Sequence, residues 1–243
     1  AAATPAPYGD HRTPRRVMSG GALHGDGLQP VILTPGDPAG VGAEISLMAF
    51  AAGMRGFILM DDPDRLAGIA SALDLSIEIK SLDAPEPLAH DHAFFPVMPL
   101  QWTERPVAGK GDSRNAEVII ASIRKAATMA KDGTAAAIVT NPINKATLKD
   151  AGFSHPGHTE FLASLAPARP GAPLMMLVGE SLRVAPATVH IALRDVPAAL
   201  TTYGIVAKGR LLNEALQLYF GCSPPRIAVC GLNPHAGENG QFG

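Results

Sequence analysis

The chain has 243 residues, of which 47% are hydrophobic and 17% are charged, and its formal net charge is −2. This is the composition of an ordinary globular protein, and the near-neutral charge argues against a nucleic-acid binder, which would carry a basic face. The two cysteines, Cys222 and Cys230, show no C-x-x-C spacing, so we expect thiols in a reducing, cytoplasmic compartment, and no apolar run is long enough to predict a membrane span.

Residues 1–28 show no helical or strand periodicity, and we expect a flexible leader there. From Pro30 onward, short β-rich runs alternate with helical patterns. Strands or extended runs are predicted over 30–34, 56–60, 76–80, 93–96, 135–140, 174–178, 183–192 and 226–230. Helices are predicted over 43–52, 63–73, 113–131, 145–151, 159–165 and 211–220. The alternation predicts an α/β fold with a largely parallel sheet, in which ligands bind beyond the carboxyl ends of the strands.

The first motif at such an end is TPGDPAGVG, Thr34–Gly42. Its glycines could let backbone N–H groups approach an anion at the start of the following helix. It is neither a G-x-G-x-x-G fingerprint nor a P-loop, and a tight turn shaped by two prolines explains it at least as well. Asp37 is therefore only a weak functional candidate.

The second motif is TNPINK, Thr140–Lys145, after the strand predicted at 135–140. Asn141 and Pro142 favour a turn, and Lys145 would place an ammonium group at the start of a helix. A lysine at a helix start is usually a solvated surface residue. Its position after a strand makes it a candidate for the site.

The third motif is HPGHTEF, His155–Phe161. His158 and Thr159 open a predicted helix, so an imidazole, a hydroxyl and unpaired backbone N–H groups could meet a phosphate or a carboxylate. The alternative is a capping box with ordinary polar side chains.

The fourth feature is a pair of histidines. His190 lies in the apolar run TVHIALRD, and His235 follows the predicted strand 226–230 in the segment NPHAGE. A single histidine in an apolar strand is more often a core residue than a ligand. Two histidines on separate strand-end loops could share a metal, but a metal site needs three or more ligands and the sequence offers no compelling third.

These motifs, in this order, resemble the 4-hydroxythreonine-4-phosphate dehydrogenase family. The resemblance runs from Val31 to Gly243 through TPGDPAGVG, TNPINK, GHTEF, the LRVA…H…LRD stretch and GLNPHAGE. It implies an isocitrate/isopropylmalate dehydrogenase-like fold, with a largely parallel sheet in two lobes and an active-site cleft between them. Residues 29–243 would then form a dehydrogenase domain with an incomplete C-terminal part.

The resemblance also implies a chemistry. Enzymes of this family use NAD or NADP and a divalent metal (Zn, Co, Mn or Mg) to oxidise 4-phosphooxy-L-threonine, which then loses CO₂ on the way to pyridoxal 5′-phosphate. His190 and His235 match two metal ligands, and His158 and Thr159 match the substrate-binding pair. Lys145 is our own candidate for proton transfer or phosphate contact. Cofactor-binding residues cannot be placed.

The resemblance further implies a homodimer with a shared active site. The family's third metal histidine lies in a later YHDQG-like motif that this chain does not contain, so we expect the chain to be a fragment. Two other functions stay open. One is a dehydrogenase of a four-carbon sugar-acid phosphate, D-threonate or D-erythronate 4-phosphate, and the other is a chain that binds ligands without catalysis.

Overall fold

A computed structural model describes residues 29–241 except 90, 156 and 167–172, so the leader expected at 1–28 lies outside the described residues. The described chain falls into two compact units. We call residues 29–166 the sheet unit and residues 173–241 the C-terminal unit.

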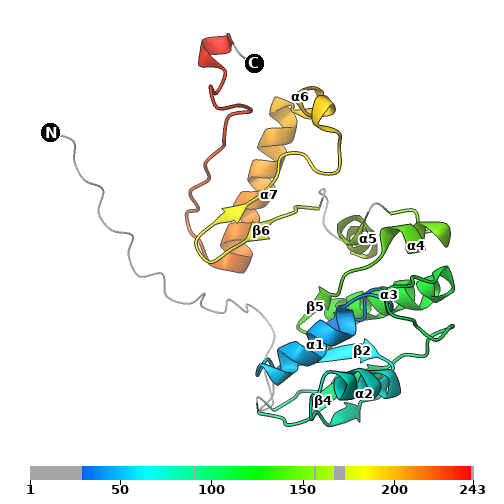
Figure 1. Ribbon diagram of the computed structural model, residues 1–243. Helices are drawn as coiled ribbons and strands as arrows, with labels where there is room; N and C mark the ends of the chain where they lie inside the picture. The colour runs from blue at the N-terminus through cyan, green and yellow to red at the C-terminus, as the bar shows by residue number, and fades with distance from the viewer. Residues whose placement is uncertain (1–28, 90, 156, 167–172, 242–243) are drawn as a thin grey trace. The chain divides into compact units, whose positions relative to one another are not determined.

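The sheet unit is built on a parallel β-sheet with helices against it (Figure 1). Its strands are β1 (Val31–Thr34), β2 (Phe57–Asp61), β3 (Ile79–Ser81), β4 (Phe95–Pro99) and β5 (Ala137–Thr140), in the spatial order β3-β4-β2-β1-β5. All four pairings are parallel. Its helices are α1 (Gly42–Ala51), α2 (Pro63–Ala72), the 3₁₀ turn η1 (Ser113–Asn115), α3 (Ala116–Lys131), α4 (Lys145–Asp150) and α5 (His158–Leu165). The predicted α/β class with a parallel sheet is confirmed.

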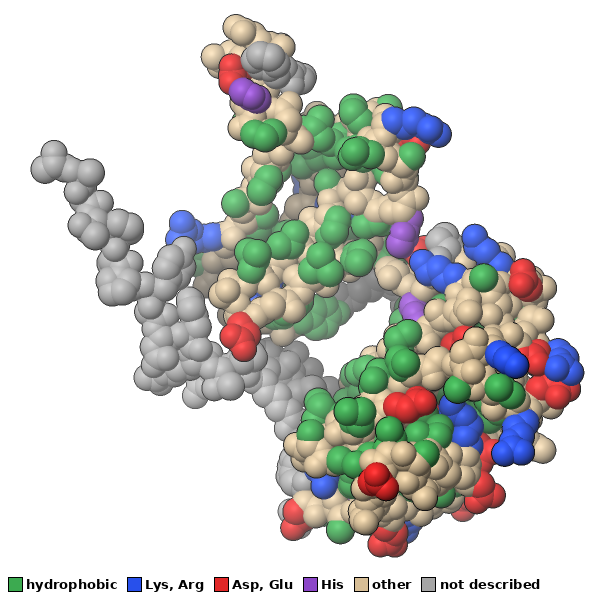
Figure 2. All heavy atoms as spheres, viewed as in Figure 1, with side chains coloured by type: hydrophobic (Ala, Val, Ile, Leu, Met, Phe, Trp, Pro, Cys, Tyr) green, Lys and Arg blue, Asp and Glu red, His purple; other side chains and the backbone are tan. Residues whose placement is uncertain are grey.

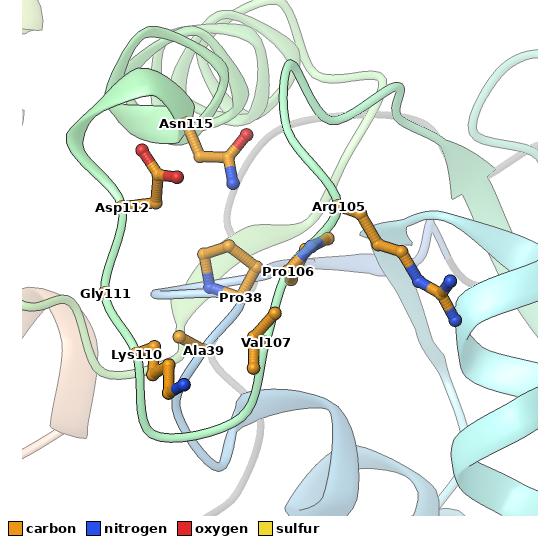
Figure 3. A pocket seen from close by; sticks show the side chains of 9 residues that line it. All are labelled: Pro38, Ala39, Arg105, Pro106, Val107, Lys110, Gly111, Asp112 and Asn115. Atoms are coloured by element: carbon orange, nitrogen blue, oxygen red, sulfur yellow. The ribbon is translucent and has the colours of Figure 1, made fainter.

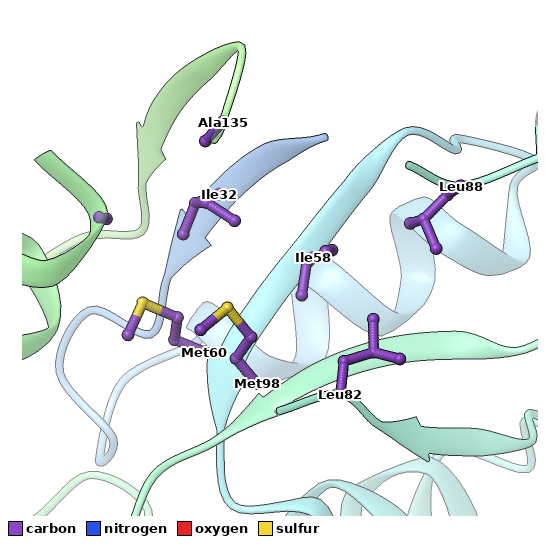
Figure 4. Packing of buried hydrophobic residues seen from close by; sticks show 8 residues of the cluster. Ile32, Ile58, Met60, Leu82, Leu88, Met98 and Ala135 are labelled. Atoms are coloured by element: carbon purple, nitrogen blue, oxygen red, sulfur yellow. The ribbon is translucent and has the colours of Figure 1, made fainter. Parts of the chain in front are cut away.

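The core lies on both faces of this sheet, as expected for parallel strands covered by helices. On one face Ile58 and Met60 of β2 pack with Ile32 of β1 and Met98 of β4 (Figure 4). On the other face, Leu59 packs in a second cluster with side chains of α1 and α2. Successive residues of β2 therefore point to opposite faces, and both sets are buried.

A third cluster joins α3, α4 and α5. It contains Ile119 and Ile123 of α3, Leu148 of α4 and Phe161 of α5, all almost fully buried. Burying a large apolar side chain contributes about 1.5–3 kcal/mol. The first turns of α4 and α5, which carry the candidate residues, are thus anchored to α3.

The ends of the elements in the sheet unit lie close to their predicted positions. The Asp62 side chain caps α2 by accepting hydrogen bonds from the N–H groups of Asp64 and Arg65, and Asp112 caps η1 ahead of α3. The strand predicted at 76–80 is β3, which begins only at Ile79 because that is where pairing with β4 begins.

The C-terminal unit contains a short antiparallel hairpin and one long helix. Its elements are β6 (Leu177–Val178), β7 (Arg183–Val184), the 3₁₀ turn η2 (Leu193–Asp195), α6 (Val196–Ala199), α7 (Thr202–Phe220) and the 3₁₀ turn η3 (Glu238–Gly240). The helix predicted at 211–220 is the second half of α7. Gly204 and Gly209 obscured the first half, because glycine has a low helix propensity.

Two predicted extended runs are wrong in this unit. The run predicted at 183–192 ends as a strand at Val184, and Pro186, which has no N–H to donate, follows soon after. The last strand predicted, Arg226–Cys230, is not a strand, and its residues are exposed. A strand needs a neighbour for its backbone N–H and C=O groups, and no described strand pairs with this segment.

The C-terminal unit has almost no core of its own. Among its described residues only Leu216 is buried, while Leu193, Tyr203 and Val229 are largely exposed. Apolar side chains accordingly cover much of the visible surface around α7 in Figure 2. None of the described helices combines the length and the apolar character needed to cross a membrane.

Candidate active site

The loop TPGDPAGVG leaves β1 and leads into α1, and residues 34–39 and Gly42 of it are buried, whereas Val41 is exposed. Asp37 is 8% exposed, and its Oδ1 accepts a hydrogen bond from the backbone N–H of Ala39 at 2.9 Å. The carboxylate therefore shapes its own turn, as aspartates commonly do. This contact favours the structural role for Asp37 over a catalytic one.

A hollow of about 180 Å³ lies beside this loop, between it and residues 105–115 (Figure 3). Two cations line it, but Arg105 and Lys110 extend in different directions and do not meet at one point. Its polar wall is already engaged, since Asn115 hydrogen-bonds the backbone of Glu104 and Asp112 pairs with Arg114. The hollow is also smaller than the usual 300–1,000 Å³ of a small-molecule site, so it is not our candidate.

The structure brings Lys145, His158 and Thr159 together at the starts of α4 and α5. Lys145 is the first residue of α4, and His158 and Thr159 are the first two residues of α5. A β-carbon placed on Gly157, the residue before His158, would lie 3.6 Å from the Lys145 ammonium nitrogen. The Lys145 ammonium nitrogen therefore lies close to the start of α5, at a distance that a β-carbon on residue 157 would meet as an ordinary van der Waals contact.

The start of α5 has the features of an anion-binding site. Gly157 occupies the N-cap position, so no side chain caps the first N–H groups of the helix. These groups and the helix dipole attract a phosphate or a carboxylate, and the Lys145 ammonium adds a full positive charge beside them.

His158 is half-buried, and its environment keeps the imidazole neutral. Burial lowers the pKa of His158 below its ordinary value of 6.5, and the positive charge of Lys145 lowers this pKa further. The Nε2 atom of His158 is buried and has no hydrogen-bond partner among the described residues. A buried nitrogen without a partner costs free energy, so a substrate group that hydrogen-bonds to it would relieve that cost.

Glu160 occupies the position of the capping-box alternative. One of its carboxylate oxygens, Oε2, lies 3.4 Å from the position of a β-carbon on Gly157 and has no hydrogen-bond partner within the described chain. The carboxylate therefore points back to the start of its own helix, as a capping-box glutamate does. No side-chain hydrogen bond caps the start of α5 in the described structure, so a capping box is not formed there, and contact of His158 and Thr159 with a ligand stays a prediction.

The predicted metal ligands, His190 and His235, both lie in the C-terminal unit and are exposed. His190 is not in a strand as the sequence suggested, but in a bend after β7, with a left-handed φ of 59°. The Nδ1 atom of His235 contacts the carboxylate of Glu238, a pairing common among metal-binding histidines. Nevertheless, the described residues contain no group of three or more side chains placed to hold a metal, so these two histidines do not by themselves form a metal site.

Comparison with known proteins identifies the family. The family described as pyridoxal phosphate biosynthetic protein PdxA matches residues 54–243, more than three quarters of the chain. The chain belongs to the PdxA family. It is 41% identical over 224 residues to a 4-hydroxythreonine-4-phosphate dehydrogenase of Methylorubrum extorquens and 42% identical over 232 residues to that of Bradyrhizobium diazoefficiens.

Solved structures of PdxA-family proteins have the same fold. The 4-hydroxythreonine-4-phosphate dehydrogenase from Klebsiella pneumoniae matches 89% of this chain with a TM-score of 0.78 and 32% identity, and the one from Burkholderia phymatum matches 89% with a TM-score of 0.73 and 32% identity. This likeness confirms the isocitrate dehydrogenase-like fold expected from the sequence. The chain spans 64% of the length of the M. extorquens relative, and 88% of this chain is covered in that match.

Sequence reasoning missed two features of the candidate site and its surroundings. One is Gly157, which occupies the N-cap position of α5 without a capping side chain, close to the Lys145 ammonium. The glycine was visible in HPGHTEF, but its proximity to a lysine from another helix was not. The other is the buried contact of Asn141 with Ser46, two residues 95 positions apart, for which the sequence carries no local signal.

Proposed function

We propose that the protein is a 4-hydroxythreonine-4-phosphate dehydrogenase that oxidises the C3 hydroxyl of 4-phosphooxy-L-threonine with NAD. The resulting β-keto acid loses CO₂ and leaves 3-amino-2-oxopropyl phosphate, for pyridoxal 5′-phosphate synthesis. One observation carries the proposal: an uncapped helix start, Lys145 and a neutral His158 converge in a chain 41% identical to an enzyme of that name.

The residues of the sheet unit take the substrate roles in this proposal. The phosphate would sit at the start of α5 against its first N–H groups, with the Thr159 hydroxyl and the Lys145 ammonium beside it. The neutral imidazole of His158 would hydrogen-bond to the substrate through Nε2. Lys145 is our candidate for phosphate contact or for a catalytic proton transfer. As an ammonium it would donate to the phosphate, and only its deprotonated amine could accept the proton of the reacting hydroxyl.

The cofactors of the proposal are a nicotinamide dinucleotide, NAD or NADP, and a divalent ion, Zn, Co, Mn or Mg. The nicotinamide would take the hydride from C3. His190 and His235 would supply two imidazole ligands, which suit Zn, Co and Mn better than Mg. Two donors are too few for such an ion, so we propose that the others come from outside the described residues, in a homodimer with a shared active site.

The test of the activity compares two proteins. One is the 243-residue chain, and the other is a chimera in which the remaining third of the M. extorquens relative follows Gly243. We expect NADH formation from 4-phosphooxy-L-threonine in the chimera and little or none in the chain alone. Chimera activity on D-threonate or D-erythronate 4-phosphate alone would establish the sugar-acid alternative. A folded chimera that binds phosphate but turns over none of these would establish the non-catalytic one.

The test of the metal ligands uses binding and not turnover. In the chimera, His190→Ala and His235→Ala should each reduce the Zn or Mn bound per chain, measured by elemental analysis after dialysis. His155→Ala, which changes a histidine of the sheet unit, is the matched control and should leave the metal content unchanged. Full metal content in either ligand variant would refute the assignment.

A further inference from the structure

The side chain of Asn141 lies between two loops that each leave the carboxyl end of a strand. Asn141 is 4% exposed and follows β5 directly. Its Nδ2 donates to the carbonyl oxygen of Gly42 at 3.3 Å and to Ser46 Oγ at 3.0 Å, both in α1. Ser46 Oγ donates in turn to the Gly42 carbonyl at 2.6 Å. The amide therefore closes a small buried network between the β5 loop and the first turn of α1.

The two loops that meet at this network are packed closely against each other. The N–H of Asp37 donates to the carbonyl oxygen of Pro142 at 2.8 Å. A β-carbon on Gly36 would lie 2.4 Å from that same oxygen, and one on Gly42 would lie 3.1 Å from the β-carbon of Asn141. Distances below 3.0 Å are a hard overlap, so Gly36 must stay a glycine for the two loops to lie this close together.

A short, well-fixed segment leads from this network to the lysine. Pro142 restricts the backbone directly after Asn141. The Asn144 side chain then caps α4 by accepting hydrogen bonds from the N–H groups of Ala146 and Thr147. Lys145 is the next residue after this cap. The backbone position of Lys145 is therefore fixed by the Asn141 side chain and by the Asn144 cap.

We propose that Asn141 is a positioning residue, whose buried amide ties the loop carrying Lys145 to α1 and so fixes where the lysine ammonium lies relative to the start of α5. The inference rests on the proposed function, in which Lys145 and His158 serve one substrate. Asn141 itself does not touch the substrate. Its removal would let the β5 loop move away from α1 and would carry Lys145 with it.

Ser122 provides a matched control for the network. Ser46 and Ser122 are both almost fully buried serines of helices, and each donates its hydroxyl to a carbonyl of its own helix. Only Ser46 also accepts the Asn141 amide. A general loosening of the fold should therefore follow from either substitution to alanine, whereas a displaced Lys145 should follow only from the change at Ser46.

The experiment measures the titration midpoint of His158 by NMR in the 243-residue chain, because this imidazole senses the charge of Lys145. Lys145→Met sets the scale, and it should raise the pKa of His158. Asn141→Ala should raise it by at least half of that change, Ser46→Ala by less, and Ser122→Ala not at all. If Asn141→Ala does not fold, the His158 midpoint of Ser46→Ala, compared with that of Ser122→Ala, tests the inference in its place.

Three results would overturn the inference. They are an unchanged midpoint in folded Asn141→Ala and Ser46→Ala, an equal change in Ser122→Ala and Ser46→Ala, and no change in Lys145→Met. The titration does not depend on turnover, so a failure of the proposed function can be told apart from a failure of this inference. In that case the chimera would have no dehydrogenase activity, but Asn141→Ala would still shift the titration midpoint of His158.

Discussion

Replacing Lys145 with methionine tests the candidate site most directly. Methionine keeps most of the length and apolar surface of the side chain and removes the ammonium, which lies 3.6 Å from the β-carbon position of Gly157 at the start of α5. We expect weaker binding of phosphorylated ligands. Lys149→Met is the matched control, because Lys149 is an exposed lysine in the last turn of the same helix.

The size of the effect follows from the exposure of Lys145. A hydrogen bond to a charged group contributes about 1.5–3 kcal/mol. Since Lys145 is exposed, water and salt screen its charge, and the lower end of that range applies. Every 1.4 kcal/mol corresponds to about a tenfold change in affinity, so Lys145→Met should weaken phosphate binding about tenfold.

Isothermal titration calorimetry with inorganic phosphate, and then with 4-phosphooxy-L-threonine, measures this change at two salt concentrations. The difference between Lys145→Met and the unmodified chain should shrink at higher salt, because screening weakens the charge that was removed. Equal affinities for the Lys145→Met and Lys149→Met variants would refute the placement of the anion at the start of α5.

Three further predictions concern stability, each measured by denaturant-induced unfolding. Gly36→Ala puts a β-carbon 2.4 Å from the Pro142 carbonyl oxygen, at a φ of 72°. It should lower the free energy of unfolding by more than the roughly 1–2 kcal/mol that a left-handed backbone costs a residue with a side chain. Gly53→Ala, at a φ of 97° with no atom near its β-carbon, is the control and should cost only that amount. Trp102→Phe removes the indole donor to the buried carboxylate at the end of β2 and should cost about 1–3 kcal/mol, so a loss below about 0.5 kcal/mol would contradict the assigned contact. The lowered pKa of His158 means that the unfolded chain takes up the proton first as the pH falls below 6.5, so stability should drop there, and His158→Gln should remove that part of the drop.

The sheet unit could be predicted from the sequence because its strands are short apolar runs buried on both faces. Ile58 and Leu59, adjacent in β2, are both fully buried, on opposite faces of the sheet. Such a run needs no alternation to be recognised, only flanking turns and helices. The limits of the strands were less predictable, since β3 begins where its partner β4 allows pairing and not where the pattern of residues 76–80 begins.

The candidate site was predictable where it depends on local sequence. The sequence placed His158 and Thr159 at the start of a helix, where the structure has them, because helix starts can be recognised from a few residues. The lowered pKa of His158 was not predictable, because it comes first from the burial of the imidazole in the fold and then from the charge of Lys145, thirteen positions earlier in the chain. Nor was the Asn141 network, which joins residues 95 and 99 positions apart.

The C-terminal unit shows the opposite case, in which local patterns misled. The apolar runs around His190 and at Arg226–Cys230 have the composition of buried strands, yet neither forms one in the described structure. Composition states only that a segment could be buried in a sheet, whereas a strand forms when a neighbour supplies hydrogen bonds along its whole length. In the same way, two histidines with suitable chemistry do not make a metal site. A metal ion needs further ligands, just as a strand needs a neighbour, and the local sequence specifies neither partner. The metal content of the His190→Ala and His235→Ala chimeras is therefore the measurement that tests the sequence assignment independently of the described geometry.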